Sequence, residues 1–209
     1  MTQTVAILTG DLIGSTAASP DRVEATMGRL ALCAAAIGPD ASFTRFRGDG
    51  WQMRLVEPGY CLKDCLYILA SLRAGNLLAT RIAVGIGIEY PTDAKDLSTA
   101  MGPAFTASGR ALEMMRPGET LALAGEEDID RYRQLVFAFA ADHAARWSTE
   151  QAEAMAMAIG PDGMTQEIIA TRVGITRQAV GARLKAAGYG LLDRASMVFL
   201  REYTAEGAP

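Results

Sequence analysis

Arg45-Phe46-Arg47-Gly48-Asp49-Gly50-Trp51 is the stretch from which a sheet can be laid out, because an Asp-Gly step between two strand-like runs predicts a tight hairpin. Asp49 lies at its tip. A second carboxylate, Asp11, follows the apolar run at 5–8, which is typical of a buried strand. Residues 12–16, Leu-Ile-Gly-Ser-Thr, then form a small-residue turn of the kind that presents backbone N–H groups to a phosphate.

Asp11 and Asp49 together predict a seat for Mg²⁺ or Mn²⁺ and a nucleoside triphosphate, because carboxylate oxygens suit these cations. Each aspartate also has a purely structural interpretation, in which Asp49 only shapes its turn and Asp11 only caps the next segment. The metal site is favoured because the predicted topology brings the strand end and the hairpin tip side by side.

Outward from the hairpin, apolar periodicity predicts the order strand, helix, hairpin, helix, strand, helix, strand. The ranges are 4–10, 20–36, 42–47 with 51–56, 60–74, 80–89, 103–115 and 120–123. This order predicts an α+β domain with a ferredoxin-like, mostly antiparallel sheet and helices packed on one face. Gly85 and Gly87 are interpreted as the close approach of a helix or as a bulge, since no helix begins at Gly87 as a dinucleotide fingerprint requires.

From Glu126 onward the pattern is entirely helical, with helices predicted at 127–146, 149–158, 165–173 and 176–187. Residues 189–203 form either a closing helix or a wing. The Trp147-Ser148-Thr149 step is the best boundary, so we expect two domains, 1–147 and an all-α domain at 148–209.

The helix pair at 165–187 has the spacing of a helix-turn-helix, carried by Gln166, Ala170, Gly174 and Val180. Thr176 is expected to cap the second helix, which leaves four side chains to meet DNA phosphates and base edges: Arg177, Gln178, Arg183 and Lys185. The segment has one anion, Glu167, and a charge of +3, because its cations are Arg172, Arg177, Arg183 and Lys185. An ordinary helical hairpin for packing or dimerisation is the alternative.

Composition sets wider limits. The 209 residues are 50% hydrophobic and 21% charged with a net charge of −4, which excludes a wholly basic nucleic-acid coat. No apolar run reaches the roughly 18 residues of a membrane span, and residues 1–4 lack the basic start of a signal peptide. We therefore expect a cytoplasmic protein with no membrane partner. Cys33, Cys61 and Cys65 are expected to be core thiols rather than metal ligands.

Several of these motifs resemble class III nucleotide cyclases. Residues 9–16 resemble their first metal-binding strand and phosphate turn, and Arg47-Gly48-Asp49 resembles their second metal-binding hairpin. Residues 81–87 resemble the next core strand, and residues 102–110 lie where the cyclases have a helix with an asparagine and an arginine. The order of Gly-Asp, Gly-Ile-Gly and Gly-Pro-Ala-Phe, followed by a helix-turn-helix, is similar to the SatD family of small bacterial proteins.

The resemblance implies roles for individual residues. Asp11 and Asp49 would hold the metal ions, and Arg110 would stabilise charge on the transferring phosphate. Thr106 stands at the place of the ribose-orienting asparagine, and Arg45 at that of the purine-selecting lysine. The implied nucleotide contacts are Leu12, Ile13, Gly14, Ser15, Thr16, Arg45 and Thr99. Because the cyclase site is shared between two chains, the resemblance also implies a homodimer.

These expectations favour a DNA-binding transcriptional regulator whose cyclase-like domain binds a purine nucleotide with Mg²⁺ and mediates dimerisation. An active class III-like nucleotidyl cyclase, forming a cyclic purine nucleotide from the triphosphate, is the alternative. Asp11, Asp49 and Arg110 favour that enzyme, whereas Thr106 and Arg45 weaken it. A third possibility is a scaffold that binds no nucleotide and only dimerises the DNA-binding part.

Overall fold

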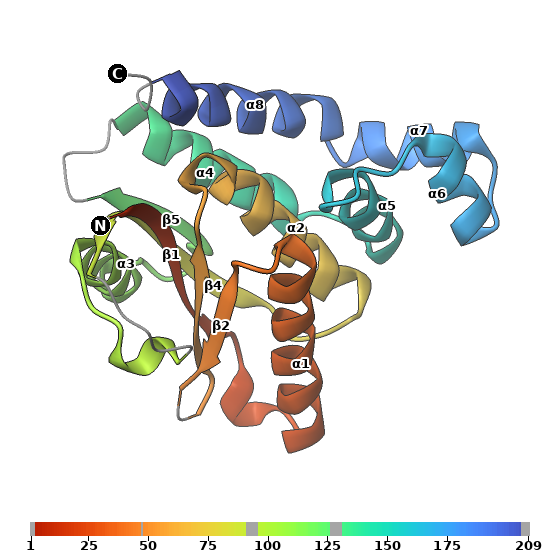
Figure 1. Ribbon diagram of the computed structural model, residues 1–209. Coiled ribbons are helices and arrows are strands. Elements are labelled where there is room, and N and C mark those ends of the chain that lie inside the picture. The colour runs from red at the N-terminus through yellow and green to blue at the C-terminus, as the bar shows by residue number, and fades with distance from the viewer. Residues whose placement is uncertain (1–2, 47, 91–95, 126–130, 206–209) are drawn as a thin grey trace.

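The computed structural model describes residues 3–46, 48–90, 96–125 and 131–205, and Figure 1 shows a sheet with helices on both sides. Within these residues the sheet has the strands β1 (Gln3–Leu12), β2 (Ser42–Arg45), β3 (Gly50–Leu55), β4 (Thr80–Glu89) and β5 (Leu121–Gly125). Their order is β2-β3-β1-β4-β5, with β5 parallel to β4 and every other neighbouring pair antiparallel. The first four strands therefore have the predicted ferredoxin-like order.

The helices of the first half of the chain lie on opposite faces of this sheet. α1 (Pro20–Ile37) and α2 (Cys61–Ala74) pack against Ala6 and Leu8, whereas Ala104 of α3 (Pro103–Met114) packs against Val5 and Ile7. The prediction of helices on one face is therefore wrong for α3. β1 is apolar at each position from 5 to 8, so both of its faces need a cover.

The hairpin formed by β2 and β3 is tied to the end of β1 by a buried tryptophan. Trp51 is fully buried, and its Nε1 donates a hydrogen bond to Thr80 Oγ1 at 2.9 Å. That hydroxyl donates in turn to the backbone carbonyl of Asp11 at 2.7 Å. The three strands that meet here are thus held together directly beneath the predicted site.

The second half of the chain is helical, as predicted. Its helices are α4 (Arg131–Ala145), α5 (Thr149–Ile159), α6 (Gln166–Val173), α7 (Arg177–Ala186) and α8 (Tyr189–Ala205). α8 answers the open question at 189–203 in favour of a helix. None of the described helices is both long and apolar enough to cross a membrane.

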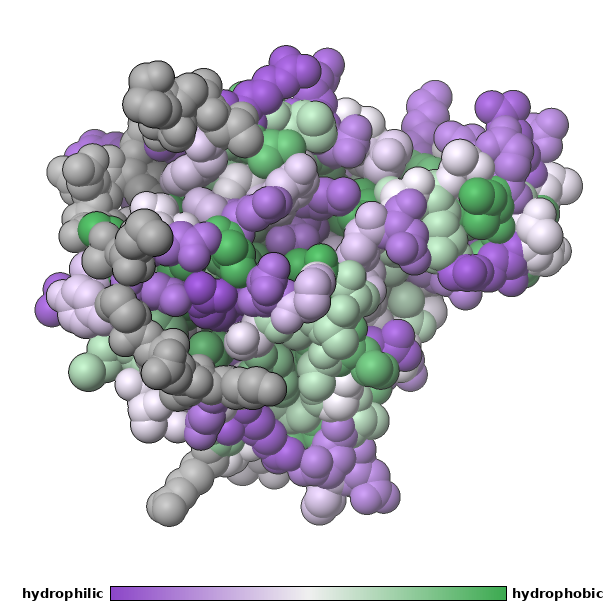
Figure 2. All heavy atoms as spheres, in the orientation of Figure 1, coloured by the Kyte–Doolittle hydropathy of each residue, from purple (hydrophilic) through white to green (hydrophobic). Residues whose placement is uncertain are grey.

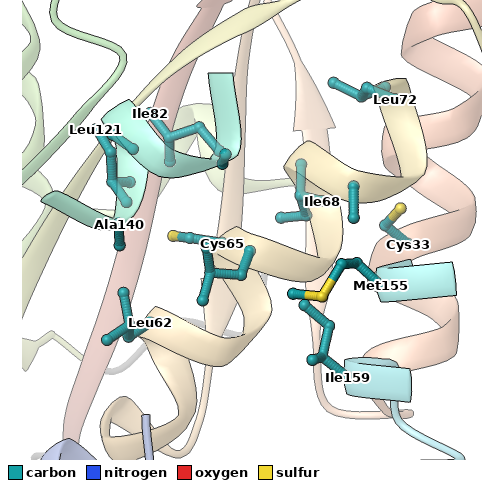
Figure 3. Packing of buried hydrophobic residues seen from close by; sticks show 14 of the residues in the cluster. Cys33, Leu62, Cys65, Ile68, Leu72, Ile82, Leu121, Ala140, Met155 and Ile159 are labelled. Atoms are coloured by element: carbon teal, nitrogen blue, oxygen red, sulfur yellow. The ribbon is translucent and has the colours of Figure 1, made fainter. Parts of the chain in front are cut away.

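One hydrophobic cluster runs from the sheet through α2 into α5. Figure 3 shows Leu62, Cys65 and Ile68 of α2 between sheet residues such as Ile82 and the α5 residues Met155 and Ile159. Trp147, at the expected domain boundary, is 1% exposed, and its Nε1 donates to the Ala187 carbonyl at 2.9 Å. The division at 147 stays a prediction, and the two parts on either side of it share a core.

The cysteines belong to this core. Cys33, Cys61 and Cys65 are free and buried, as expected for core thiols. Burial raises the pKa of the Cys61 and Cys65 thiols well above the usual value, which keeps both of them protonated.

Candidate functional site

The two predicted metal-binding carboxylates lie at one end of the sheet. Asp11 pairs with Gly50 in the β1–β3 register, and the backbone N–H of Leu12 donates to the Asp49 carbonyl at 3.2 Å. The hairpin tip therefore lies beside the end of β1, as the topology predicted.

A positively charged side chain of the protein, that of Arg81, lies at this position. Asp11 forms a two-point ion pair with Arg81, whose Nε donates to Asp11 Oδ1 at 2.8 Å and whose Nη2 contacts Oδ2. The pKa of Arg81 is raised, first by the hydrogen bond to Asp11 and further by the charges of Asp11 and Asp49. The field of both carboxylates therefore acts on one guanidinium.

Sequence reasoning missed Arg81 as a site residue. It stands near the start of an apolar strand, and the register places it directly opposite Asp11. The signal in the sequence is a charged residue directly before the apolar run at 82–88 of this strand. Which residue faces Asp11 depends on strand pairing over a separation of 70 residues.

The donor chemistry at this place fits a divalent cation. Asp11 and Asp49 offer the hard oxygen ligands that Mg²⁺ and Mn²⁺ prefer. The Arg81 guanidinium contacts Asp11, which shows that positive charge is favoured at this place. Asp49 also accepts a hydrogen bond from Ser15 Oγ. Among the described residues no group of three or more His, Cys, Asp or Glu side chains gathers around a common point.

The turn after β1 offers fewer donors to a phosphate than the sequence suggested. The N–H of Leu12 is bound to Asp49, that of Ile13 donates to the Ala79 carbonyl at 2.7 Å, and the Leu12 side chain is buried. Gly14 is left-handed, with a φ of 75°, and leads into the short 3-10 helix Ser15–Ala17. The part of the predicted turn that stays available to a nucleotide is therefore 14–16.

Arg45 contacts the hairpin one residue before Asp49, whereas Thr99 lies on a separate segment of the chain. The Arg45 guanidinium is paired with Glu24 of α1 at 2.6 Å and donates to the Gly48 carbonyl. Thr99 is exposed at the end of the 3-10 helix Leu97–Thr99. Within the described parts of the chain, no hydrogen bond or ion pair joins either residue to Asp11 or Asp49.

Thr106 and Arg110 project from the exposed side of α3. The inner side of that helix is set by Ala104 and Ser108, which lie against Gly85, and Ser108 Oγ shares a hydrogen bond with Thr9 Oγ1 at 2.7 Å. Positions 106 and 110 are offset from these by half a turn and face outward. Both line an open groove of about 1560 Å³ along α3, β5 and α4. Among the described residues of one chain, no contact joins Thr106 or Arg110 to the two carboxylates.

The predicted helix pair forms two short helices, α6 and α7, joined by a tight turn at one end of the molecule. Gly174 ends α6 with a φ of 73°, and Thr176 Oγ1 caps α7 by accepting from the Ala179 N–H at 3.1 Å. Ala170 and Val180 are buried between the helices. Gly174 and Thr176 therefore form the turn and the helix cap that the sequence predicted, and a DNA-binding role for the pair stays a prediction.

The polar side chains of α7 differ in how they are engaged. Gln178 and Lys185 are exposed, and Arg177 forms an exposed ion pair with Glu167 at 2.6 Å. Arg183, predicted to be free, instead pairs with Glu153 of α5 at 3.4 Å, because α7 packs on α5. Figure 2 shows hydrophilic side chains over much of the end that α6 and α7 form.

Comparison with known proteins finds similarity to solved structures of nucleotide cyclases. No protein-family model matches the chain, and no curated protein matches it. The guanylyl cyclase Cya2 is 16% identical with a TM-score of 0.44, over 59% of this chain and 75% of that one. The guanylate cyclase domain of RhGC from Catenaria anguillulae in complex with GTP is 17% identical with a TM-score of 0.43, over 56% and 76%.

A third similar structure is the adenylate/guanylate cyclase/hydrolase from Silicibacter pomeroyi. It is 19% identical with a TM-score of 0.42, over 59% of this chain and 76% of that one. With TM-scores below 0.5, these similarities carry no weight for the function of this chain, which must be inferred from its own residues.

Proposed function

We propose that the chain is a DNA-binding transcriptional regulator, dimeric, whose sheet binds a purine nucleoside triphosphate with Mg²⁺. The observation that carries the proposal is α7, a capped helix. Polar residues on this helix are exposed, and its large apolar residues are buried against α5 and α6. Val180 and Leu184 anchor it from beneath, together with Ile169 of α6. A helix held in this way can enter a major groove as a rigid unit.

The exposed residues of α7 suit the two kinds of DNA contact. Gln178 lies in the first turn of α7, where a recognition helix meets base edges, and its amide can pair with adenine. Lys185 is placed to neutralise a phosphate. The Arg177–Glu167 pair is exposed, and such pairs contribute only about 0–1 kcal/mol, so Arg177 can exchange Glu167 for a phosphate.

Nucleotide binding is proposed at Asp11 and Asp49. Mg²⁺ or Mn²⁺ held there would neutralise triphosphate oxygens. The chain itself contributes the two carboxylates and the exposed part of the 14–16 turn. Roles for Arg45 and Thr99 in selecting a purine stay predictions, as does membership of the SatD family.

The proposed dimer would couple the two functions. Two copies of α7 can read half-sites one DNA turn apart only if their spacing is held by another contact. A nucleotide that changes that spacing would alter DNA affinity by a coupling free energy of about 1 to 3 kcal/mol.

DNA binding is tested with a fluorescein-labelled pool of random-sequence 30-base-pair duplexes, followed by anisotropy and by sequencing of the retained duplexes. Wild type is expected to bind with a strong dependence on salt and to enrich a sequence motif. Lys185→Ala should weaken binding to all sequences by about tenfold and lower the salt slope by about one, whereas Gln178→Ala should relax the motif.

Arg29→Ala is the matched control, because Arg29 is an exposed cation on α1. It should bind the pool as wild type does. Wild-type protein that retains no duplex in 50 mM salt would contradict the proposal, and so would a Lys185→Ala, Gln178→Ala double variant that binds like wild type.

An active nucleotidyl cyclase is the second candidate, favoured by the adjacency of Asp11 and Asp49. Since Thr106 and Arg110 make no described contact with them, turnover would have to join residues of two chains. Incubation with each nucleoside triphosphate and Mg²⁺ or Mn²⁺, followed by chromatography, tests this candidate. A cyclic product that Asp49→Asn abolishes would establish the enzyme, and intact nucleotide alone would exclude it.

A further inference from the structure

The ion pair between Arg81 and Asp11 occupies the place where a metal ion would need a ligand. Both Asp11 oxygens contact the guanidinium. The side chains of Arg81 and Asp11 are 35% and 26% exposed, so solvent reaches the pair. A cation bound by Asp11 therefore has to share or replace this contact.

We propose that Arg81 and a divalent cation compete for Asp11, and that metal binding releases the Arg81 guanidinium to contact the triphosphate. The inference rests on the proposed nucleotide function and names a residue that controls it. In the metal-free protein, Arg81 holds Asp11.

Charge repulsion supports exchange over simultaneous binding. Asp11, Asp49 and Arg81 together carry −1, so the site without metal repels a polyphosphate. A divalent ion changes the total, Arg81 included, to +1, and the displaced guanidinium is then one of the positive groups beside the phosphates. Two cations kept on one carboxylate would repel each other strongly at this separation.

The surroundings of Arg81 permit its side chain to move without disturbing the sheet. Its backbone is held by pairing with Asp11 in the β1–β4 register. Among the described residues, the guanidinium has hydrogen bonds to Asp11 alone. Arg54 on β3 differs, because it binds both oxygens of Glu89 and also the Asp40 carbonyl.

The test is a titration of the full chain with Mn²⁺ alone, in which free Mn²⁺ is counted by electron paramagnetic resonance. Arg81→Gln removes the competing charge and should bind Mn²⁺ about tenfold more tightly than wild type, equal to a difference of about 1.4 kcal/mol. Arg81→Lys, which keeps one charge but loses the two-point contact, should lie between them. The tightening should vanish when Asp49→Asn is added to Arg81→Gln.

Arg146→Gln is the matched control, because it removes an arginine from an exposed pair with Asp142 on α4. It should leave Mn²⁺ binding at the wild-type value. Equal or weaker Mn²⁺ binding by both Arg81 variants would overturn the proposal, as would equal tightening by Arg146→Gln or no Mn²⁺ binding by any variant.

The second half of the proposal is tested with a non-hydrolysable purine triphosphate. In wild type, the triphosphate should tighten Mn²⁺ binding more than it does in Arg81→Gln, because only wild type has a guanidinium to release. Equal tightening would overturn the role of Arg81 toward phosphate. If Arg81→Gln binds Mn²⁺ more tightly but no variant binds the triphosphate, the competition stands and the proposed nucleotide function fails.

Discussion

Asp64 has a charge state that depends on its place in the fold. It lies in the first turn of α2 and is only 9% exposed. Burial raises its pKa from the usual 3.8 to about 7, against an opposing effect of Lys63 and with a smaller contribution from Glu57. Near neutral pH this carboxyl therefore changes between its neutral and charged forms.

The raised pKa predicts that the folded state loses stability as pH rises. Between about pH 4 and pH 7 folded Asp64 keeps its proton while unfolded Asp64 has lost it, so the free energy of unfolding falls across this window and levels off above it. The contribution is on the order of 4 kcal/mol at most. Urea unfolding of wild type and Asp64→Asn at pH 5 and pH 8 measures it.

Asp64→Asn should flatten this part of the pH dependence, whereas Asp40→Asn, at an exposed neighbouring position, should keep it. A slope in Asp64→Asn that equals the wild-type slope would refute the assignment.

Arg183 and Lys185 have opposite expected roles although they are two residues apart. Arg183 is paired with Glu153, so Arg183→Ala should lower the free energy of unfolding by roughly 1 kcal/mol and change DNA affinity little. Lys185→Ala should do the reverse, since Lys185 is exposed. Urea unfolding and duplex anisotropy on both variants test this difference. A loss of stability in Lys185→Ala together with a loss of DNA affinity in Arg183→Ala would contradict it.

At the scale of elements, the packing of α3 depends on the absence of a side chain at one strand position. A Cβ at Gly85 would lie 2.2 Å from the Ala104 carbonyl oxygen and 2.5 Å from the Ser108 nitrogen. Both are backbone atoms of α3, so the helix would have to move away from β4. Of the two sequence interpretations of Gly85, a helix contact or a bulge, the structure shows the helix contact.

Gly85→Ala is therefore expected to lower the free energy of unfolding by about 1 to 3 kcal/mol, as overpacking against fixed backbone does. Gly28→Ala is the matched control, because nothing lies within 4 Å of a Cβ there. Placed inside α1, it should raise stability by about 0.5 to 1 kcal/mol. Urea denaturation measures both, and a neutral Gly85→Ala would show that α3 is not packed tightly on β4.

At the scale of the molecule, the shared core predicts that the chain unfolds as one unit. The two tryptophans report on different places, because Trp51 is in β3 and Trp147 lies between α4 and α5. Fluorescence of Trp51→Phe and Trp147→Phe in urea should give coincident midpoints with circular dichroism for each variant. A separate transition seen only by Trp147 would show that residues 148–209 unfold independently.

The proposed dimer predicts a concentration-dependent mass of twice the chain in sedimentation velocity. Purine triphosphate with Mg²⁺ should shift this equilibrium or leave it dimeric, since both ligands are proposed to bind a dimer. A monomer at all concentrations, with and without nucleotide and duplex DNA, would contradict the dimeric regulator.

Features that depend on neighbours in the chain were predictable from the residues. Ser19 and Pro20 begin α1, with the Arg22 N–H donating to Ser19 Oγ at 3.4 Å, and Gly174 with Thr176 shapes the α6–α7 turn. The adjacency of Asp11 and Asp49 also followed, because hairpin and strand order constrain it. Caps, tight turns and apolar periodicity are local signals that survive any packing of the whole.

Features that join distant segments needed the tertiary structure. The pairing of Arg81 with Asp11, the pairing of Arg183 with Glu153 and the raised pKa of Asp64 depend on strand register, helix contact and burial. The side of the sheet that α3 covers was likewise decided by packing. The physical reason is that a side chain's partner and its solvation are properties of the space around it, and segments far apart in the chain supply that space.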